Sequence, residues 1–236
     1  MDRLGTLIGG VMVGEVRAGP SVAANAGLCL WIAPEGAGLC LGLGKGCPDA
    51  ALVSAALHWP LGQALLQGGA VALTLAPGDP RLGLAALLQA EVGAPRCGAQ
   101  SLLAAYVEGL MVHVLRHAIE SGQQTVGLLA GLAEPRLARA LVAIHDAPAQ
   151  GWSAQALAEE AGMSRSAFMG RFRDVVGQTP MAYLRGWRLM RAQGDLARGG
   201  RVAEVARRYG YRSADAFARA YQGHHGVVPS AARPQG

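Results

Sequence analysis

The chain has 236 residues, of which 51% are hydrophobic, 16% are charged and 5% are aromatic. This composition excludes intrinsic disorder, and the length suits two compact domains. We expect no membrane span, because the most apolar segment, 102–115, contains Glu108 and His113 and is shorter than the ~20 residues that a span needs. The N-terminus lacks the basic start and the cleavage site of a signal peptide, so the sequence predicts a cytoplasmic protein.

The charge is distributed unevenly along the chain. Residues 135–236 carry 15 arginines, no lysine and 7 acidic residues, a net charge of +8. Residues 1–134 carry 6 basic and 9 acidic residues, a net charge of −3. A GC-rich genome would explain the preference for arginine over lysine, but not the difference between the halves. An acidic front half joined to a basic back half is typical of a protein that binds nucleic acid through a separate domain.

The first 80 residues are expected to form short strands. Apolar runs bounded by glycine and proline turns lie at 11–16, 28–33, 39–43 and 71–75. The segment 50–67 fits either a helix or a buried strand, because Pro60 interrupts its apolar run. This part of the chain therefore predicts a β-rich unit.

Two helices are expected to follow these strands. Asp79 as the N-cap and Pro80 at the first helical position predict a helix through 82–92. After a turn, Ser101 is expected to cap a longer helix that ends near Glu120, with an apolar stripe broad enough for burial on more than one side. Residues 123–134 then read as a linker.

The back half has helical periodicity throughout, and two of its segments, 153–177 and 201–226, share a pattern. Each has a short helix, a glycine, a bulky apolar residue, a serine N-cap and a second helix with a phenylalanine four residues after the serine. The glycine, serine and phenylalanine are Gly162, Ser164 and Phe168 in the first segment, and Gly210, Ser213 and Phe217 in the second.

This pattern is that of a helix-turn-helix motif. Glycine allows the tight turn, the serine hydroxyl satisfies free backbone amides, and the second helix can then enter the major groove of DNA. A single match would be weak, since such corners are common in helical bundles. Two in tandem, within a segment of charge +8, predict binding to double-stranded DNA.

Residues 135–233 resemble the DNA-binding domain of AraC/XylS-type transcription regulators. The resemblance covers 163–189 and 202–233, where the second stretch closes in a G-x-x-P-x-x-x-R pattern at Gly226, Pro229 and Arg233. It implies a seven-helix unit with two helix-turn-helix motifs joined by a long helix at about 181–198, whose two recognition helices read successive major grooves. It further implies a bacterial transcription regulator, with RNA polymerase as a partner.

The resemblance also implies which residues face DNA. These are Arg165, Ser166, Met169, Arg171 and Arg173 in the first recognition helix, and Arg212, Ala214, Asp215 and Arg219 around the second. Gly170 stands where the family has a long polar residue and offers no contact to a base edge. Arg219 can pair with guanine and Asp215 can accept from cytosine, whereas Arg212 is expected at phosphate. The alternative for each arginine is a solvated surface charge. Core positions are expected at Leu157, Phe168, Phe172, Leu184, Phe217 and Tyr221.

Residues 131–168 also resemble the subgroup of this family whose N-terminal half is a cupin-type β-barrel. The front half is shorter than usual in that subgroup and lacks its histidine-containing strand. We therefore expect an α+β fold class: a reduced cupin-like β-unit with dimer helices, followed by an all-α domain with two helix-turn-helix motifs. The predicted domains are a sensor and dimerisation domain at 1–122, a linker at 123–134 and the DNA-binding domain at 135–236. The helix that starts at Ser101 suits a homodimer interface.

All four cysteines, Cys29, Cys40, Cys47 and Cys97, lie in the front half, and their spacing is not that of a zinc site. One interpretation is that they are buried and inert. The other is a thiol redox switch or a soft-metal sensor, in which Cys47 and Cys97 react first because each lies near a cation, with Cys29 and Cys40 as partners or core. Stable disulfides are the least expected in the cytosol.

Other chemistry finds little support in the sequence. A catalytic Ser–His–Asp order, a P-loop and a dinucleotide fingerprint are missing, so we expect no enzymatic activity and no cofactor beyond a soft metal ion. His113 and His117 lie one helical turn apart and are expected to pack or to face a dimer partner. A small organic effector remains an alternative signal, and a methyl-accepting DNA-repair regulator is a more distant one.

Overall fold

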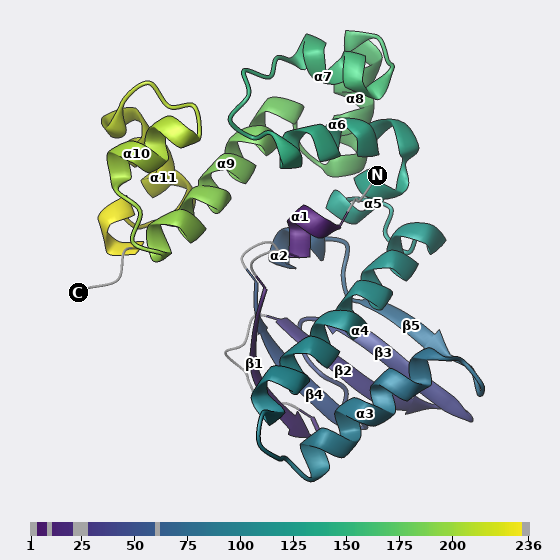
Figure 1. Cartoon of the computed structure of the whole chain (residues 1–236). Coiled ribbons are helices and arrows are strands. Elements are labelled where there is room, and N and C mark those ends of the chain that lie inside the picture. Colours follow the sequence, from purple (N-terminus) through teal and green to yellow (C-terminus); the bar gives the residue numbers. More distant parts are fainter. Residues whose placement is uncertain (1–3, 9–10, 21–27, 60–61, 233–236) are drawn as a thin grey trace. The chain divides into compact units, whose positions relative to one another are not determined.

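The computed structural model describes residues 4–8, 11–20, 28–59 and 62–232 (Figure 1). The chain divides into two compact units, and the second begins at Glu134. We call Ile8–Ala133 the N-terminal unit and Glu134 onward the C-terminal unit. The first residues of α1 (Gly5–Ile8) group with the C-terminal unit, which the sequence did not predict. Leu4 and Leu7 are both buried, so this short segment is held by packing.

The described part of the N-terminal unit contains a five-stranded antiparallel sheet in the order β1-β4-β2-β3-β5. Its strands are β1 (Met12–Ala18), β2 (Leu28–Glu35), β3 (Gly38–Gly44), β4 (Val53–His58) and β5 (Val71–Leu75). The four predicted strands are confirmed within two residues at each end. The ambiguous segment 50–67 provides β4 and the short α2 (Gly62–Leu65), on either side of Pro60, which lies outside the described residues.

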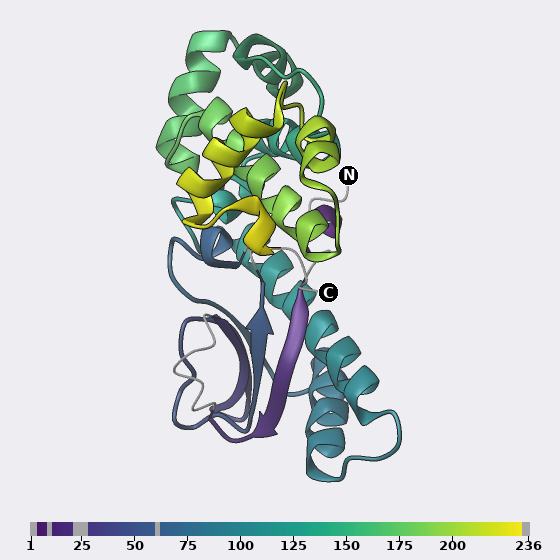
Figure 2. The same ribbon diagram turned by 90° about the vertical axis from the view of Figure 1, so that its left-hand side faces the viewer.

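One face of this sheet is apolar and is covered by α3 (Arg81–Gly93) and α4 (Ala99–Ser121), as Figures 1 and 2 show. Leu30 pairs with Leu43 and Ile32 with Leu41 across β2 and β3, and all four side chains are buried. Opposed residues of neighbouring strands share a face, so these pairs form the core beneath the helices. The described strands form an open sheet with β1 and β5 at its edges, and a cupin-like origin stays a prediction.

The helix starts differ from those expected. Gly98, with a φ of +85°, is the N-cap of α4, and Ser101 lies exposed in the first turn, so its predicted capping role is wrong. Pro80 is the N-cap of α3, one residue later than predicted, although the Asp79 carboxylate still accepts from the Arg81 backbone N–H at 2.9 Å. The segment expected as a linker contains a short helix, α5 (Leu128–Ala133). Its side chains Leu128, Leu129 and Leu132 are buried, so packing stabilises this helix.

By length and composition, α4 alone among the described helices could cross a membrane, which corrects the expectation that this segment is too short. Seven of its residues are buried, including Val107, Leu110 and Met111. These side chains lie on the helix that covers the sheet, so the apolar character of α4 serves packing within the unit.

The described part of the C-terminal unit is all-helical. It contains α6 (Pro135–Asp146), α7 (Ala154–Ala161), α8 (Arg165–Val176), α9 (Pro180–Ala197), α10 (Val202–Arg208), α11 (Ala214–His225) and a short 3₁₀ helix, η1 (Pro229–Ala232). Four of these helices begin at a hydroxyl N-cap whose oxygen accepts from the backbone N–H three residues on, at 3.1–3.3 Å. The caps are Ser153, Ser164, Thr179 and Ser213.

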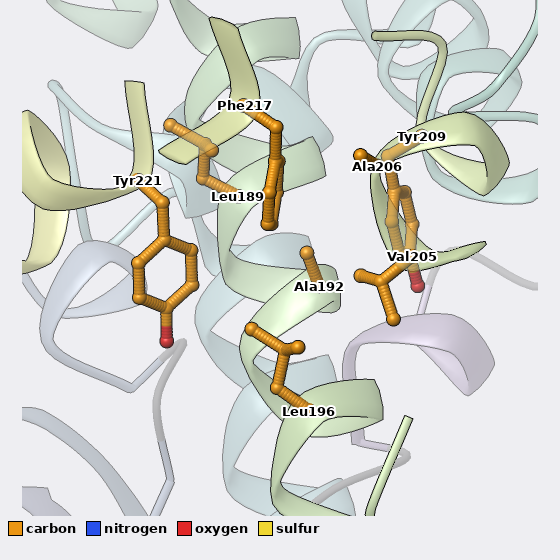
Figure 3. Packing of buried hydrophobic residues seen from close by; sticks show 8 residues of the cluster. All are labelled: Leu189, Ala192, Leu196, Val205, Ala206, Tyr209, Phe217 and Tyr221. Atoms are coloured by element: carbon orange, nitrogen blue, oxygen red, sulfur yellow. The ribbon is translucent and has the colours of Figure 1, made fainter. Parts of the chain in front are cut away.

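The long helix α9 contributes to two separate cores. Its first half packs in a first lobe with α6, α7 and α8. Four of the six core positions expected from the sequence lie in this lobe, and all four are buried: Leu157, Phe168, Phe172 and Leu184. Its second half packs in a second lobe with α10 and α11 (Figure 3). There Leu189, Ala192 and Leu196 of α9 meet Val205, Ala206, Tyr209, Phe217 and Tyr221.

Candidate nucleic-acid interface

The helix pairs α7–α8 and α10–α11 turn in the same way. The turn glycine has a φ of +63° at Gly162 and +80° at Gly210. In both turns its N–H bonds to the carbonyl three residues back, and the following N–H bonds to a carbonyl five residues back, at 2.9–3.0 Å. This pair of backbone hydrogen bonds defines a Schellman motif, in which one residue has a left-handed backbone conformation that favours glycine.

The first turn is strengthened by a side chain from α6. Arg139 donates from Nε to Glu160 O at 3.0 Å and from Nη2 to Ala161 O at 2.7 Å. These carbonyls belong to the last turn of α7, where no intrahelical donor is left. Arg139 is therefore occupied in the fold and fixes the direction in which α7 enters the turn.

Two aromatic side chains anchor the inner face of each second helix. Phe168 and Phe172 hold α8 in the first lobe, and Phe217 and Tyr221 hold α11 in the second. The opposite faces of both helices consequently point to solvent. Of the nine positions predicted to face DNA, Met169 and Ala214 are half-buried, and the others are exposed: Arg165, Ser166, Arg171, Arg173, Arg212, Asp215 and Arg219.

The structure separates the predicted arginines into two groups. Arg171 donates from Nε to the Glu134 carboxylate at 2.8 Å, so its charge is matched within the C-terminal unit. The other four, Arg165, Arg173, Arg212 and Arg219, form no ion pair with any described residue. These four remain available for phosphate or base contacts.

Gly170 lies on the exposed face of α8 with open space around it. A Cβ built on this residue would meet no atom within 4 Å. The surface of α8 is therefore open at Gly170, where the sequence predicts that no side chain reaches a base. Arg233, which closes the family pattern, lies outside the described residues.

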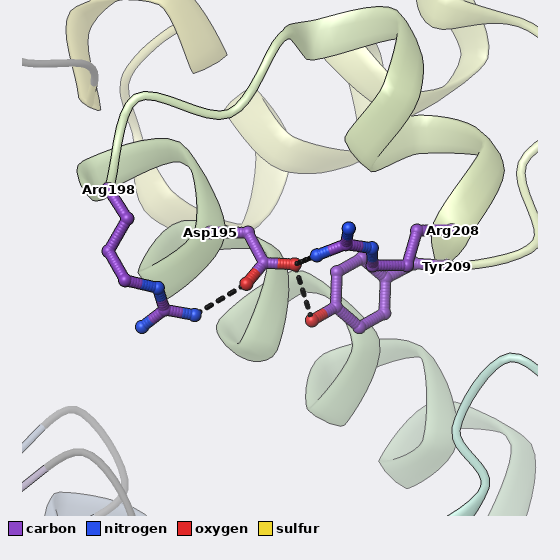
Figure 4. Close-up of polar contacts among 4 residues, drawn as sticks. All are labelled: Asp195, Arg198, Arg208 and Tyr209. Atoms are coloured by element: carbon purple, nitrogen blue, oxygen red, sulfur yellow. Dashed lines mark hydrogen bonds and ion pairs between the residues drawn. The ribbon is translucent and has the colours of Figure 1, made fainter.

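Asp195 of α9 was not singled out from the sequence, yet it organises the second lobe (Figure 4). Its Oδ1 accepts from Arg198 Nη2 at 2.5 Å, and its Oδ2 accepts from Arg208 Nη1 at 2.8 Å and from the Tyr209 hydroxyl at 3.1 Å. Burial raises the pKa of this carboxyl, but the three donors outweigh burial and hold the pKa below the usual 3.8. Asp195 thereby fastens α10 to α9 and occupies two more arginines.

The four cysteines lie in different surroundings. Cys29 is buried on β2 and its thiol donates to Leu30 O at 3.3 Å, the half-buried Cys47 donates to Pro48 O at 3.8 Å, and Cys97 is exposed in the turn before α4. Burial and Cys47 raise the pKa of Cys29 to about 12. Burial, with Glu35 beside it, raises the pKa of Cys40 to about 11. Cys47 is thus near enough to Cys29 to affect its pKa, and the described residues contain no group of three or more His, Cys, Asp or Glu side chains that could hold a metal ion.

Comparison with known proteins places the C-terminal half in a family. Residues 157–235 match a family model described as a helix-turn-helix domain. An AraC-like transcription regulator from Streptomyces lividans is 40% identical over 134 residues, which cover 56% of this chain and 44% of that protein. Another from Streptomyces antibioticus is 38% identical over 122 residues, which cover 51% of this chain and 40% of that protein.

A solved structure of the DNA-binding domain of AdpA, a global transcriptional factor, in complex with a target DNA is 32% identical. It covers 44% of this chain and 99% of that domain, with a TM-score of 0.38. The chain spans less than half the length of the two Streptomyces relatives that it matches. By its helix-turn-helix domain, the chain belongs to the AraC/XylS family of transcription regulators.

Proposed function

We propose that this protein is a sequence-specific transcription regulator whose C-terminal unit binds double-stranded DNA through α8 and α11. The observation that carries the proposal is the repeated helix pair: each has a glycine turn, a serine cap and an aromatic-anchored second helix with unpaired arginines at its exposed face. We interpret both pairs as helix-turn-helix motifs. Family membership supports a regulator rather than an enzyme.

The length of α9 supports the use of both motifs on one DNA. An 18-residue helix is about 27 Å long, close to the ~34 Å that separate successive major grooves on one side of B-DNA. The two recognition helices, carried at either end of α9, would enter adjacent major grooves. Arg165, Arg173 and Arg212 would bind phosphates, whereas Arg219 would contact a guanine.

The remaining predicted positions take smaller parts. Ser166, Met169 and Ala214 would pack against base edges, and Asp215 would accept from cytosine. Arg171 is assigned to the fold rather than to DNA, because Glu134 already holds its guanidinium. Direct reading of bases would therefore depend more on α11 than on α8, where Gly170 leaves an open position.

Binding of the full chain to duplexes selected from a random pool tests this proposal. The logarithm of the affinity should fall linearly with the logarithm of the salt concentration, because phosphate contacts release counterions. Arg219→Ala should lose about 1–3 kcal/mol of discrimination at one base position. Arg136→Ala is the matched control, since it removes an exposed arginine from α6, outside both recognition helices. If no duplex is enriched, or if Arg219→Ala keeps full discrimination, the proposal fails.

For the N-terminal unit we propose a role in sensing a signal and in joining two copies of the chain. The protein would act in the cytoplasm, with RNA polymerase as its partner once it is bound to DNA. Leu87 of α3 and Leu102 of α4 are 53% and 40% exposed, and they lie on the two helices that cover the sheet. These two leucines would supply apolar area to an interface between the two copies. Leu87→Glu and Leu102→Glu should lower the fraction of dimer in sedimentation analysis, and an unchanged mass would argue against this interface.

The influence of Cys47 on the pKa of Cys29 indicates that the two thiols are near each other, which supports a thiol input. A hydroperoxide would oxidise the Cys47 thiol to a sulfenic acid with release of water or an alcohol, and the Cys29 thiol would then displace water to form a disulfide. Peptide mapping after hydrogen peroxide treatment should find the Cys29–Cys47 link, and Cys97→Ser should not prevent it. If oxidation leaves DNA affinity unchanged, the alternative is a small organic effector.

A further inference from the structure

Arg188 of α9 binds a loop of the first lobe through two hydrogen bonds. Its Nε donates to Pro148 O at 2.6 Å, and its Nη2 donates to Gln150 O at 2.8 Å. Both carbonyls belong to the loop between α6 and α7, which leads into the first helix pair. The same loop is held by Trp152, whose Nε1 donates to Ala147 O at 2.9 Å. Arg188 therefore binds a loop that also has a side-chain hydrogen bond of its own.

The turn of the second helix pair lies against the same guanidinium. A Cβ built on Gly210 would be 3.5 Å from Ala149 O and 3.6 Å from the Arg188 Cζ. The next residue, Tyr211, lies near the same charge. Burial raises the pKa of its hydroxyl, and the positive charges of Arg188 and Arg185 oppose that rise. Three segments thus converge on Arg188, namely the α6–α7 loop, the middle of α9 and the α10–α11 turn.

At this position one side chain of α9 bonds a loop of the first lobe and also lies beside the turn of the second. The core of the second lobe involves α9, α10 and α11, and that of the first involves α6–α9. Each core packs on its own half of α9, so the orientation of one lobe relative to the other depends on α9 itself and on side chains that contact both lobes.

We propose that Arg188 is a positioning residue for DNA binding, which sets the spacing and rotation of α8 relative to α11 by clamping the α6–α7 loop beside the α10–α11 turn. This inference rests on the proposed function. It assigns Arg188 to the geometry between the two recognition helices rather than to contact with DNA, since its Nε and Nη2 already donate to carbonyls within the protein.

A lysine cannot replace this clamp. The guanidinium holds its N–H donors in a fixed plane, so Nε and Nη2 reach two carbonyls two residues apart, whereas an ammonium is a point charge on a flexible stem. Arg188→Lys keeps the charge and loses the paired geometry. Arg188→Ala removes both and leaves the carbonyls of Pro148 and Gln150 without this donor.

The test uses the full chain and a set of duplexes that carry the two boxes selected by the wild-type protein from a random pool. The distance between the boxes is varied by up to three base pairs, where two base pairs rotate one box by roughly 70° relative to the other. Affinity and its salt dependence are measured for the wild type, Arg188→Ala, Arg188→Lys and Arg185→Ala. Arg185 is the control because it is an exposed arginine of the same helix that forms no ion pair with a described residue.

We expect the wild type and Arg185→Ala to bind best at one distance and to lose at least about tenfold when it changes by two base pairs. Both Arg188 variants should bind about tenfold more weakly at that distance, respond little to the change in distance, and keep the wild-type salt slope. A sharp wild-type optimum in both variants would overturn the inference. So would an equal loss at every distance with a salt slope reduced by about one, which marks a phosphate contact.

Circular dichroism of each variant shows whether it is folded, and so separates unfolding from a changed dependence on the distance between the boxes. If Arg188→Ala is unfolded, Arg188→Lys decides: a broad distance profile supports the inference and a sharp one overturns it. Failure of the wild type to select any duplex would contradict the proposed function itself. Selection of two boxes by the wild type, with an unchanged optimum in the Arg188 variants, would contradict this inference alone.

Discussion

Glycine has opposite roles at two positions of the first helix pair. Gly162 ends α7 with a φ of +63°, and a Cβ built on it would lie 2.9 Å from Arg139 Nη2. Gly170 lies inside α8 with nothing within 4 Å of its Cβ position. The first requires glycine, while the second only loses helix propensity by having it.

We therefore expect Gly170→Ala to raise the free energy of unfolding by about 1 kcal/mol, as measured by urea denaturation followed by circular dichroism. Gly162→Ala, the same change in the same helix pair, should lower it by more than about 1 kcal/mol. Equal effects of the two substitutions would contradict the assignment of their backbone roles.

A buried histidine makes the stability of the first lobe depend on pH. His145 bonds to the Tyr183 hydroxyl at 2.5 Å and packs against Trp187 with ring centroids 4.0 Å apart. Burial, aided by the charge of Arg191, lowers its pKa to about 3. Between pH 6.5 and about 3 the unfolded chain binds a proton here that the folded chain does not, so the free energy of unfolding falls as the pH falls.

At pH 4.5 this group should cost about 2–3 kcal/mol of stability relative to pH 7.5. His145→Gln should flatten the decline between these pH values in urea denaturation. His117→Gln, in the N-terminal unit, is the control and should leave the decline unchanged. A decline as steep in His145→Gln as in the wild type would refute the role assigned to this histidine.

At the scale of elements, Asp195 joins α9 to α10. The carboxylate is 9% exposed, whereas the side chains of its two arginine partners are 71% and 66% exposed, so solvent weakens both ion pairs. Its pKa lies below 3.8 in the folded chain. The contribution of the carboxylate is therefore present above the unfolded pKa and is lost as the pH falls through the folded value.

Asp195→Asn should lower the free energy of unfolding by about 1–2 kcal/mol at pH 7, because three hydrogen bonds to a charged acceptor are weakened. The difference from the wild type should shrink in urea titrations below pH 4. Asp174→Asn, at an exposed position of α8, serves as the control. A constant difference across the pH range would show that the lost charge is not the cause.

Local signals in the sequence were enough to find most elements. Ser164 and Ser213 were found as N-caps because a cap depends on residues three positions apart, and the strands were found because turn residues bound them. The strand β4 stayed ambiguous, because a continuous apolar run does not distinguish a buried strand from a helix.

Tertiary contacts could not be predicted in this way. Arg188 meets carbonyls 38 and 40 residues away, and Arg171 meets Glu134 37 residues away. Each looked like any other arginine of a basic domain. The start of α4 was misplaced because Ser101 is a good cap by type, whereas the backbone of Gly98 decides where the helix begins.

At the scale of the whole chain, the excess of arginine in the back half serves two purposes. Arg139, Arg171, Arg188, Arg198 and Arg208 bond to the protein itself and hold helices and loops in place. Four arginines that form no ion pair with a described residue, Arg165, Arg173, Arg212 and Arg219, lie on or beside α8 and α11, whereas others, such as Arg136 and Arg185, lie on other helices. The net charge of +8 therefore overstates the number of phosphates that the protein would neutralise.

The slope of log affinity against log salt should accordingly report about four phosphate contacts or fewer, well below the number of arginines in the unit. Arg173→Ala should reduce the slope by about one, whereas Arg139→Ala should lower stability and leave the slope unchanged. A slope change of equal size for both variants would contradict the division of the arginines into two groups.

The most direct measurement is protection of individual bases and phosphates in a selected duplex by the full chain. The account predicts two protected boxes in successive major grooves on one side of the DNA. Arg219→Ala should remove protection from a guanine in one box, and Arg165→Ala with Arg173→Ala should weaken phosphate protection around the other. Protection of a single box, or loss of the same contacts in both sets of variants, would contradict the claim that α8 and α11 bind DNA together.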